Sequence, residues 1–154
     1  MKPKMARKNL LGRSDIRNAV ITVLMESNFP SDNAVLNEAD FVFQYNCELE
    51  SGGHESFIRW QSHEILQIGI TPYLAKLIEI LEKIEAVEYA SILKKYGEQM
   101  WALYIALENN EISEESYYEV INQADKEYFD LNDKIYDLIS IYFVNIHTQL
   151  IDIE

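Results

Sequence analysis

The chain has 154 residues, the usual length of one domain, and hydrophobic residues make up 48% of it, enough for a buried core. Its five glycines and three prolines argue against disorder, and its single cysteine, Cys47, cannot form an internal disulfide. The net charge of −13 argues against direct binding to nucleic acid or to anionic membranes and favours a basic partner.

The charge is unevenly distributed along the chain. Residues 1–25 contain six basic residues and one acidic residue, a net charge of +5, so the remainder carries −18. We expect residues 1–8 to be a loose basic tail and residues 9–154 to be a single helical domain. The alternative is that Arg7, Lys8 and Arg13 fold onto the acidic face of the protein or onto a second subunit.

Localisation is predicted from what the chain lacks. No run of about 18 apolar residues occurs, and no small-residue cleavage site follows the short apolar stretch near the start. Together with the lone cysteine, this predicts a soluble, cytoplasmic protein.

Apolar residues recur at helical spacing along nearly the whole chain, which predicts an all-α bundle of six or seven helices with a long C-terminal helix. Gly52 and Gly53 suit the left-handed backbone that closes a helix, so we interpret them as a structural turn. The expected helical segments are residues 14–27, 31–51, 57–60, 71–84, 87–107, 113–121 and 126–151.

No motif in the sequence indicates catalysis. The residues four positions after His54 and His63 are Ile58 and Gln67, so neither histidine completes the His-Glu-x-x-His zinc motif. His147 lacks the preceding glutamate of a di-iron bundle, and no nucleophile elbow or phosphate-binding glycine loop is present. The sequence therefore predicts no catalytic residues, no metal and no cofactor, and a protein that is not an enzyme.

The acidic residues of the C-terminal third are the strongest pattern. From Glu108 onward only Lys126 and Lys134 oppose the acids Glu108, Glu111, Glu114, Glu115, Glu119, Asp125, Glu127, Asp130, Asp133, Asp137, Asp152 and Glu154. Residues three or four apart on a helix have Cβ atoms about 5–6 Å apart, comparable to the spacing of phosphates along DNA. We therefore predict one acidic, partner-binding face on the last helix and the segment before it: Glu119, Glu127, Asp130, Asp133 and Asp137.

Three segments resemble a known family. They are Glu48-Leu49-Glu50-Ser51-Gly52-Gly53-His54-Glu55-Ser56-Phe57, then Ile68-Gly69-Ile70 with the following helix, and then Asp125 to Gln149. In this order they resemble the DMP-type DNA-mimic proteins, a bacterial family most of whose members are known only as a domain of unknown function. Ser51 and His54 replace the Asn and Phe usual in that family. The resemblance implies an all-helical, acidic protein, often dimeric, in a family whose studied member occupies the DNA-binding surface of a transcription factor.

The favoured hypothesis is therefore a non-enzymatic acidic protein that binds a basic or DNA-binding protein and acts by charge. One alternative is an immunity or antitoxin-like inhibitor of a basic toxin. Another is a structural helical dimer whose acidity is incidental. Neither direct nucleic-acid binding nor membrane binding is expected, and a homodimer is left open.

Overall fold

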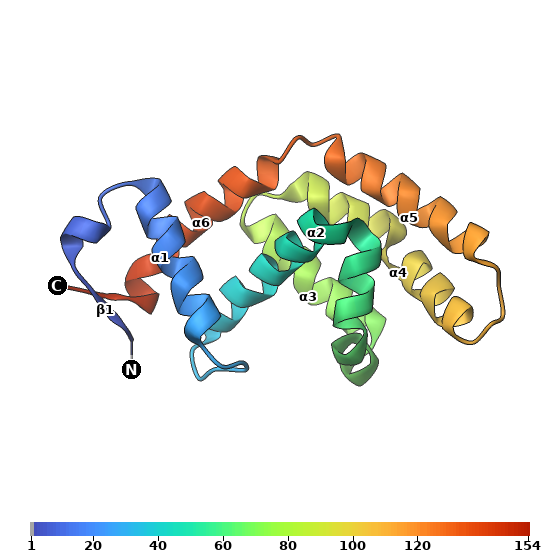
Figure 1. Ribbon diagram of the computed structural model, residues 1–154, viewed down its shortest axis with the longest axis horizontal. Helices are drawn as coiled ribbons and strands as arrows, with labels where there is room; N and C mark the ends of the chain where they lie inside the picture. Colours follow the sequence, from blue (N-terminus) through green and yellow to red (C-terminus); the bar gives the residue numbers. More distant parts are fainter. Residues whose placement is uncertain (1) are drawn as a thin grey trace. The chain divides into compact units, whose positions relative to one another are not determined.

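The structure is a computed structural model and describes residues 2–154. These residues form six α-helices and two very short strands, so the predicted all-α fold is confirmed (Figure 1). The chain divides into two compact units. The first unit holds the residues up to Phe43 together with Ile135–Glu154, and the second holds Gln44–Lys134.

The two ends of the chain meet in the first unit. Strand β1 (Lys4–Met5) pairs in parallel with strand β2 (Asp152–Ile153), with Lys4 opposite Asp152. A short 3-10 helix, η1 (Arg7–Asn9), follows β1. The expectation of a loose basic tail is therefore wrong for the described residues before Asn9. A local reading of the sequence could not show that the hydrogen-bonding partner of this segment lies at the other end of the chain.

Helix α1 (Arg13–Glu26), the start of α2 (Ala34–Ile68) and helix α6 (Lys134–Leu150) supply the core of the first unit. Helix α2 begins at Ala34 because the Asn33 side chain accepts hydrogen bonds from the backbone N–H groups of Val35 and Leu36, at 2.9 and 3.2 Å. The aromatic rings of Phe43 and Phe143 lie 6.2 Å apart between centroids. The most deeply buried apolar side chains of this unit are Val20, Ala39, Val42, Ile135, Ile139, Phe143 and Ile151.

The second unit contains the rest of α2, helix α3 (Ile70–Lys83), helix α4 (Val87–Glu108) and helix α5 (Glu114–Phe129). Helices α3 and α4 pack against each other, as do α4 and α5. Gly97 allows the first of these contacts, because a Cβ at this position would lie 2.7 Å from the Leu74 side chain. The core is rich in aromatic residues, and six buried tyrosines belong to this unit: Tyr45, Tyr73, Tyr89, Tyr96, Tyr117 and Tyr128.

Helix α2 bends at the predicted glycine turn. Gly52 and Gly53 leave helical geometry, and Gly53 has φ 71° and ψ −161°, a conformation that residues with a side chain rarely adopt. Helical structure then resumes at once and continues to Ile68. The sequence thus located the turn correctly, but the segment after it is much longer than the short piece predicted around Phe57 and Trp60.

The predicted long C-terminal helix over residues 126–151 is wrong. Helix α5 ends at Phe129 and α6 begins at Lys134, with a turn between them. Asn132 and Asp133 have positive φ values of 53° and 60°. Asn and Asp tolerate this left-handed backbone better than most residues, so a polar segment with acceptable helical spacing forms a turn instead. Among residues 2–154, no helix combines the length and the apolar character that a membrane crossing requires.

Candidate acidic interface

The turn between α5 and α6 divides the predicted acidic face. Glu119 and Glu127 lie on α5, Asp130 and Asp133 lie in the turn, and Asp137 lies in the first turn of α6, which belongs to the other unit. The reversal of the backbone at Asn132 and Asp133 ends the helical spacing on which the prediction depended. The structure therefore does not place these carboxylates in one row on one helix.

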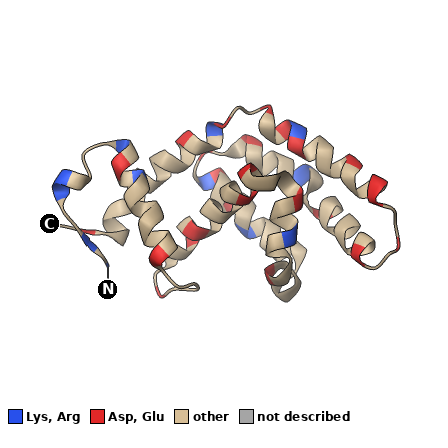
Figure 2. Cartoon of the chain, in the orientation of Figure 1, with Lys and Arg blue, Asp and Glu red and all other residues tan. Residues whose placement is uncertain are grey.

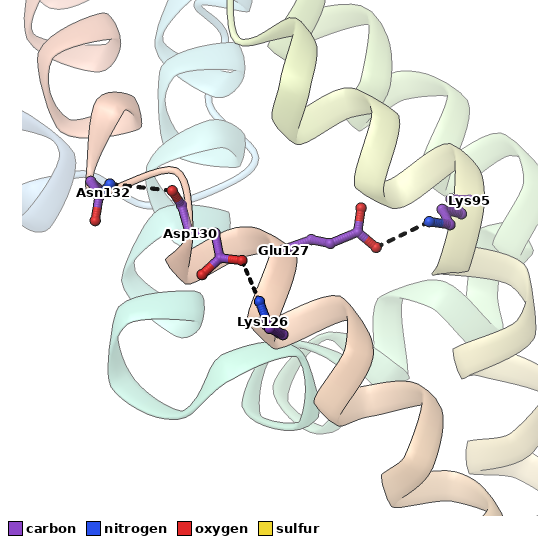
Figure 3. A network of polar contacts seen from close by, with 5 residues as sticks. All are labelled: Lys95, Lys126, Glu127, Asp130 and Asn132. Atoms are coloured by element: carbon purple, nitrogen blue, oxygen red, sulfur yellow. Dashed lines mark hydrogen bonds and ion pairs between the residues drawn. The ribbon is translucent and has the colours of Figure 1, made fainter.

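Two of these acids are paired with lysines of the same unit (Figure 3). Glu127 lies 3.3 Å from the Lys95 ammonium of α4, and Asp130 lies 2.7 Å from the Lys126 ammonium. A hydrogen bond from Tyr96, followed by the contact with Lys95, lowers the pKa of Glu127. The hydrogen bond to Asp130 raises the pKa of Lys126. These pairs leave Glu127 and Asp130 less able to attract an external cation.

A second group of acids lies at the end of the α4–α5 hairpin, and we call it the acidic hairpin. Its members, all exposed, are Glu108 at the end of α4, Glu111 in the turn, and Glu114, Glu115 and Glu119 on α5. Among the described residues none of the five forms an ion pair within the 4.0 Å limit that defines one. Of the predicted site residues, only Glu119 belongs to it.

The local sequence explains the shape of this hairpin. Asn110 reverses the chain with φ 58°, and Ser113 precedes α5 in an extended conformation. No lysine or arginine occurs between Lys95 and Lys126. Figure 2 accordingly shows acidic positions and no basic position along the α4–α5 turn. The acids of this turn were visible in the sequence, but the row on the last helix received more weight there.

A pocket of about 260 Å³ opens beside the acidic hairpin. The second half of α2 supplies Glu55 and Arg59 to its wall, and the two hairpin helices and their turn supply the rest. The full lining is Glu55, Arg59, Tyr104, Leu107, Glu108, Asn110, Glu114, Tyr117 and Tyr118. Glu55 is fixed in this wall, because it accepts a hydrogen bond from the Tyr118 hydroxyl at 2.7 Å and lies 3.4 Å from the Arg59 guanidinium.

A partly buried polar contact ties α5 to the bend in α2. The Asp125 carboxylate accepts hydrogen bonds from the backbone N–H of His54 at 2.8 Å and from its ring Nδ1 at 2.7 Å. A Cβ on Gly53 would lie 2.6 Å from the same carboxylate, so the bend needs glycine for space as well as for its positive φ. In the sequence, His54 is part of an incomplete zinc motif and replaces the Phe usual in the resembled family, and neither observation indicates this contact. The signal for it is a glycine pair followed by a residue able to donate to a distant acid.

Tyr128 extends this contact, one turn along α5 from Asp125. Its hydroxyl donates to Glu50 at 2.9 Å and lies 3.3 Å from the side-chain oxygen of Asn46, and both residues lie on α2. Burial, together with the hydrogen bond to Glu50, raises the pKa of Tyr128. These contacts fix α5, and with it the acidic hairpin, against α2.

The residues that the structure describes include no group of three or more His, Cys, Asp or Glu side chains that could hold a metal ion. His54 is fully buried against Asp125, and His63 is exposed. What this arrangement offers chemically is negative charge on a rigid hairpin, beside a pocket of tyrosine rings.

Comparison with known proteins gives one finding. The family model described as DMP19-like protein matches residues 32–147. No match was found among curated proteins or among solved structures. The matched range covers the helices from the start of α2 into α6, and it contains the glycine bend, His54, Asp125 and the whole acidic hairpin. This chain therefore belongs to the DMP19-like protein family.

Proposed function

We propose that this chain is a non-enzymatic binding protein whose acidic hairpin occupies the positively charged surface of a DNA-binding protein. The observation that carries the proposal is a set of five exposed carboxylates that form no ion pair with any described residue, fixed on two helices and their turn in one compact unit. Charged groups held on rigid elements lose little freedom on binding and attract an oppositely charged surface over a distance.

The charges of the second unit support this reading. Residues 44–134 contain 18 acidic and seven basic residues, a net charge of −11 out of the −13 of the whole chain. In the hairpin, Glu115 and Glu119 are four residues apart on α5, which makes their side chains neighbours. Neighbouring carboxylates on one helix face repeat negative charge at a spacing comparable to that of DNA phosphates.

Stability accounts for only part of this set, because Glu114 and Glu115 lie in the first turn of α5, where the helix dipole favours negative charge. Glu108 is the last residue of α4, where the helix dipole disfavours a negative charge. Glu115 and Glu119 repel each other at their spacing of four residues. Acids that cost a little stability where they stand are more readily explained by binding than by solubility alone, because acids at other surface positions would serve solubility equally well.

The test is capture of a partner from an extract of the native host by wild-type protein and by the triple variant Glu111→Gln, Glu115→Gln, Glu119→Gln. We expect the wild type to retain a basic DNA-binding protein in about 50 mM salt and to release it as salt rises, because screening shortens to about 8 Å at 0.15 M. The variant should fold but fail to retain this protein. Duplex DNA carrying the partner's binding site should then compete with the chain for the purified partner.

Two outcomes would contradict the proposal: wild type and variant retain the same proteins, or the retained partner binds DNA and the chain at the same time. A retained nuclease or other toxin that the chain inhibits would instead support an immunity role. The same acidic hairpin would then act on a different basic protein.

A homodimer is the second candidate, and exposed apolar side chains favour it. Trp60, Leu66 and Ile68, all on the second half of α2, are 71%, 66% and 45% exposed. Large apolar groups left in water often mark contact surfaces. Sedimentation equilibrium of the wild type and of Trp60→Glu tests this directly. A wild-type dimer that the substitution dissociates supports the candidate, and a wild-type monomer removes it.

A further inference from the structure

The pocket beside the acidic hairpin has the size and the lining of a site for one cationic side chain. Its volume of about 260 Å³ falls below the range of roughly 300–1,000 Å³ that is typical of cofactor and small-molecule sites. Three carboxylates, those of Glu55, Glu108 and Glu114, and one guanidinium, that of Arg59, line it. Its formal charge is therefore −2, which attracts a cation and repels an anion.

The aromatic part of the wall strengthens this preference. Tyr104, Tyr117 and Tyr118 all line the pocket. The Tyr117 ring centroid lies 6.3 Å from that of Tyr104 and 5.2 Å from that of Tyr118, so the three rings form one cluster. The face of an aromatic ring carries negative charge and attracts a guanidinium or ammonium group placed against it.

One polar atom of this wall lacks a partner. Tyr117 is 1% exposed, and its hydroxyl oxygen is buried without a hydrogen bond to any described residue. Burial raises the pKa of Tyr117, and the charged and polar groups that act on this hydroxyl are Glu55, Tyr118, Tyr104 and Arg59. All four line the pocket, which places the hydroxyl beside it. A buried hydroxyl without a partner is unfavourable, and a ligand that donates an N–H would relieve this.

We propose that this pocket receives one arginine side chain of the basic protein that the acidic hairpin binds, an inference that rests on the proposed function. A guanidinium is flat, so it can stack on the tyrosine rings. Its five N–H donors can bond to a carboxylate and to a hydroxyl at the same time. An ammonium is compact and strongly hydrated, and it gains less from rings and a hydroxyl. The hairpin thus attracts the basic partner protein through charge, and the pocket binds one arginine side chain of that partner.

The experiment uses the chain alone with N-acetyl-arginine amide as the probe, so that it does not depend on knowing the partner. We expect NMR titration to shift the ring signals of Tyr104, Tyr117 and Tyr118, with a dissociation constant on the order of 1 mM. N-acetyl-lysine amide should bind more weakly. N-acetyl-citrulline amide, which keeps the shape of arginine without the charge, should not bind.

Matched variants separate the pocket from general attraction to an acidic protein. Glu114→Gln should weaken probe binding two- to fivefold, whereas Glu115→Gln, its exposed neighbour outside the pocket, should change it less than Glu114→Gln does. Arg59→Gln should tighten binding by a similar factor, because it removes the only positive charge of the lining. Tyr117→Phe should weaken binding roughly fivefold while leaving the protein at least as stable, since the lost hydroxyl has no partner to abandon.

The proposal is overturned if the arginine probe leaves the tyrosine signals unchanged, if Glu114→Gln and Glu115→Gln weaken binding equally, or if Arg59→Gln weakens it. Spermidine or the lysine probe binding as tightly as the arginine probe also overturns it, because the site would then recognise charge alone. Failure of the arginine-pocket proposal can be distinguished from failure of the proposed function. A partner that is retained through the hairpin while the probe does not bind contradicts only the pocket. Probe binding without any retained partner leaves the pocket valid and contradicts the function.

Discussion

The carboxylate of Asp125 accepts two hydrogen bonds from His54, from the backbone N–H at 2.8 Å and from the ring Nδ1 at 2.7 Å. The His54 side chain is fully buried, and Asp125 lies on α5, 71 residues further along the chain. An ionised carboxylate can only accept hydrogen bonds, so this contact places the ring proton on Nδ1. One acid therefore holds the bend of α2, the histidine ring and helix α5 together.

Replacing Asp125 tests this contact. Asp125→Ala leaves two buried donors without an acceptor, and we expect the free energy of unfolding to fall by about 3 kcal/mol. Asp125→Asn keeps one acceptor oxygen and should lower the free energy of unfolding by less. Urea denaturation followed by circular dichroism measures both. Glu119→Ala, at an exposed position of the same helix, should change stability by less than about 0.5 kcal/mol. Equal effects of Asp125→Ala and Glu119→Ala would contradict the role assigned to Asp125.

Gly53 should not tolerate even alanine. Gly53→Ala would place a methyl group 2.6 Å from the Asp125 carboxylate, in a backbone conformation with φ 71°. We expect the loss of stability to be about 2 kcal/mol or more. Gly12→Ala is the matched control, because its new Cβ would lie 3.7 Å from Asp15, an ordinary contact. The loss of stability in Gly12→Ala should be limited to the effect of a poorer helix cap, about 1 kcal/mol or less. Thermal unfolding curves that showed Gly53→Ala as the milder change would refute this reading.

Stability should fall in alkaline solution. Burial raises the pKa of Tyr45, Tyr73, Tyr117, Tyr128 and Tyr142, and acceptor carboxylates raise it further for Tyr128 and Tyr142. The unfolded chain releases these protons near pH 10, whereas the folded protein keeps them. Each such tyrosine therefore stabilises the fold fully below about pH 10. Its contribution declines by about 1.4 kcal/mol per pH unit as the pH rises above that value towards the raised pKa.

This pH dependence can be measured through two signals. Urea denaturation between pH 8 and 11.5 should give a steeply falling stability, and the absorbance of tyrosinate near 295 nm should stay low until the protein unfolds. Tyr142→Phe removes one of these tyrosines, so the free energy of unfolding of this variant should fall less steeply with pH than that of the wild type. A tyrosinate signal from most of the ten tyrosines of a protein still folded at pH 11 would refute the prediction.

Paired and unpaired carboxylates should differ in their importance for the partner. The double variant Glu127→Gln, Asp130→Asn removes acids that Lys95 and Lys126 already neutralise, so partner affinity should change less than about twofold. The double variant Glu111→Gln, Glu119→Gln removes the same number of charges from the acidic hairpin and should weaken binding by roughly fivefold or more. Calorimetric titration at two salt concentrations compares them. Equal losses of partner affinity in the two double variants would mean that the total charge of the protein, and not the acidic hairpin, determines binding.

Removing residues 1–6 should destabilise the first unit. The truncation deletes the acceptors of hydrogen bonds from Asp152 and Glu154 and leaves β2 unpaired. We expect the melting temperature to fall by roughly 5 °C. Lys4→Gln, which removes only an exposed ion pair at 3.7 Å with Glu154, should leave it nearly unchanged. An unchanged melting temperature of the truncated protein would show that the strand pair contributes nothing to the fold.

Local sequence patterns gave most of the secondary structure. The spacing of apolar residues predicted helices at α3 and α4 within a residue or two of their observed ends, since each is amphipathic and bounded by a residue that stops a helix. Gly52 and Gly53 also marked the bend of α2 in the sequence, because glycine readily adopts the backbone conformations that interrupt a helix. The break between α5 and α6 was missed because Asp130, Asn132 and Asp133 are compatible both with a solvated helix face and with a left-handed turn.

The all-α class, the excess of negative charge and the position of the glycine bend could be predicted from the sequence, because each depends on composition or on residues close together in the chain. Which acids keep an unneutralised charge depends on long-range contacts between helices. Lys95 reaches Glu127 from another helix, whereas no cation among residues 2–154 forms an ion pair with Glu111 or Glu119. Charge in a sequence adds up irrespective of position, but the field that a partner meets depends on which opposite charges the fold brings within a few ångströms.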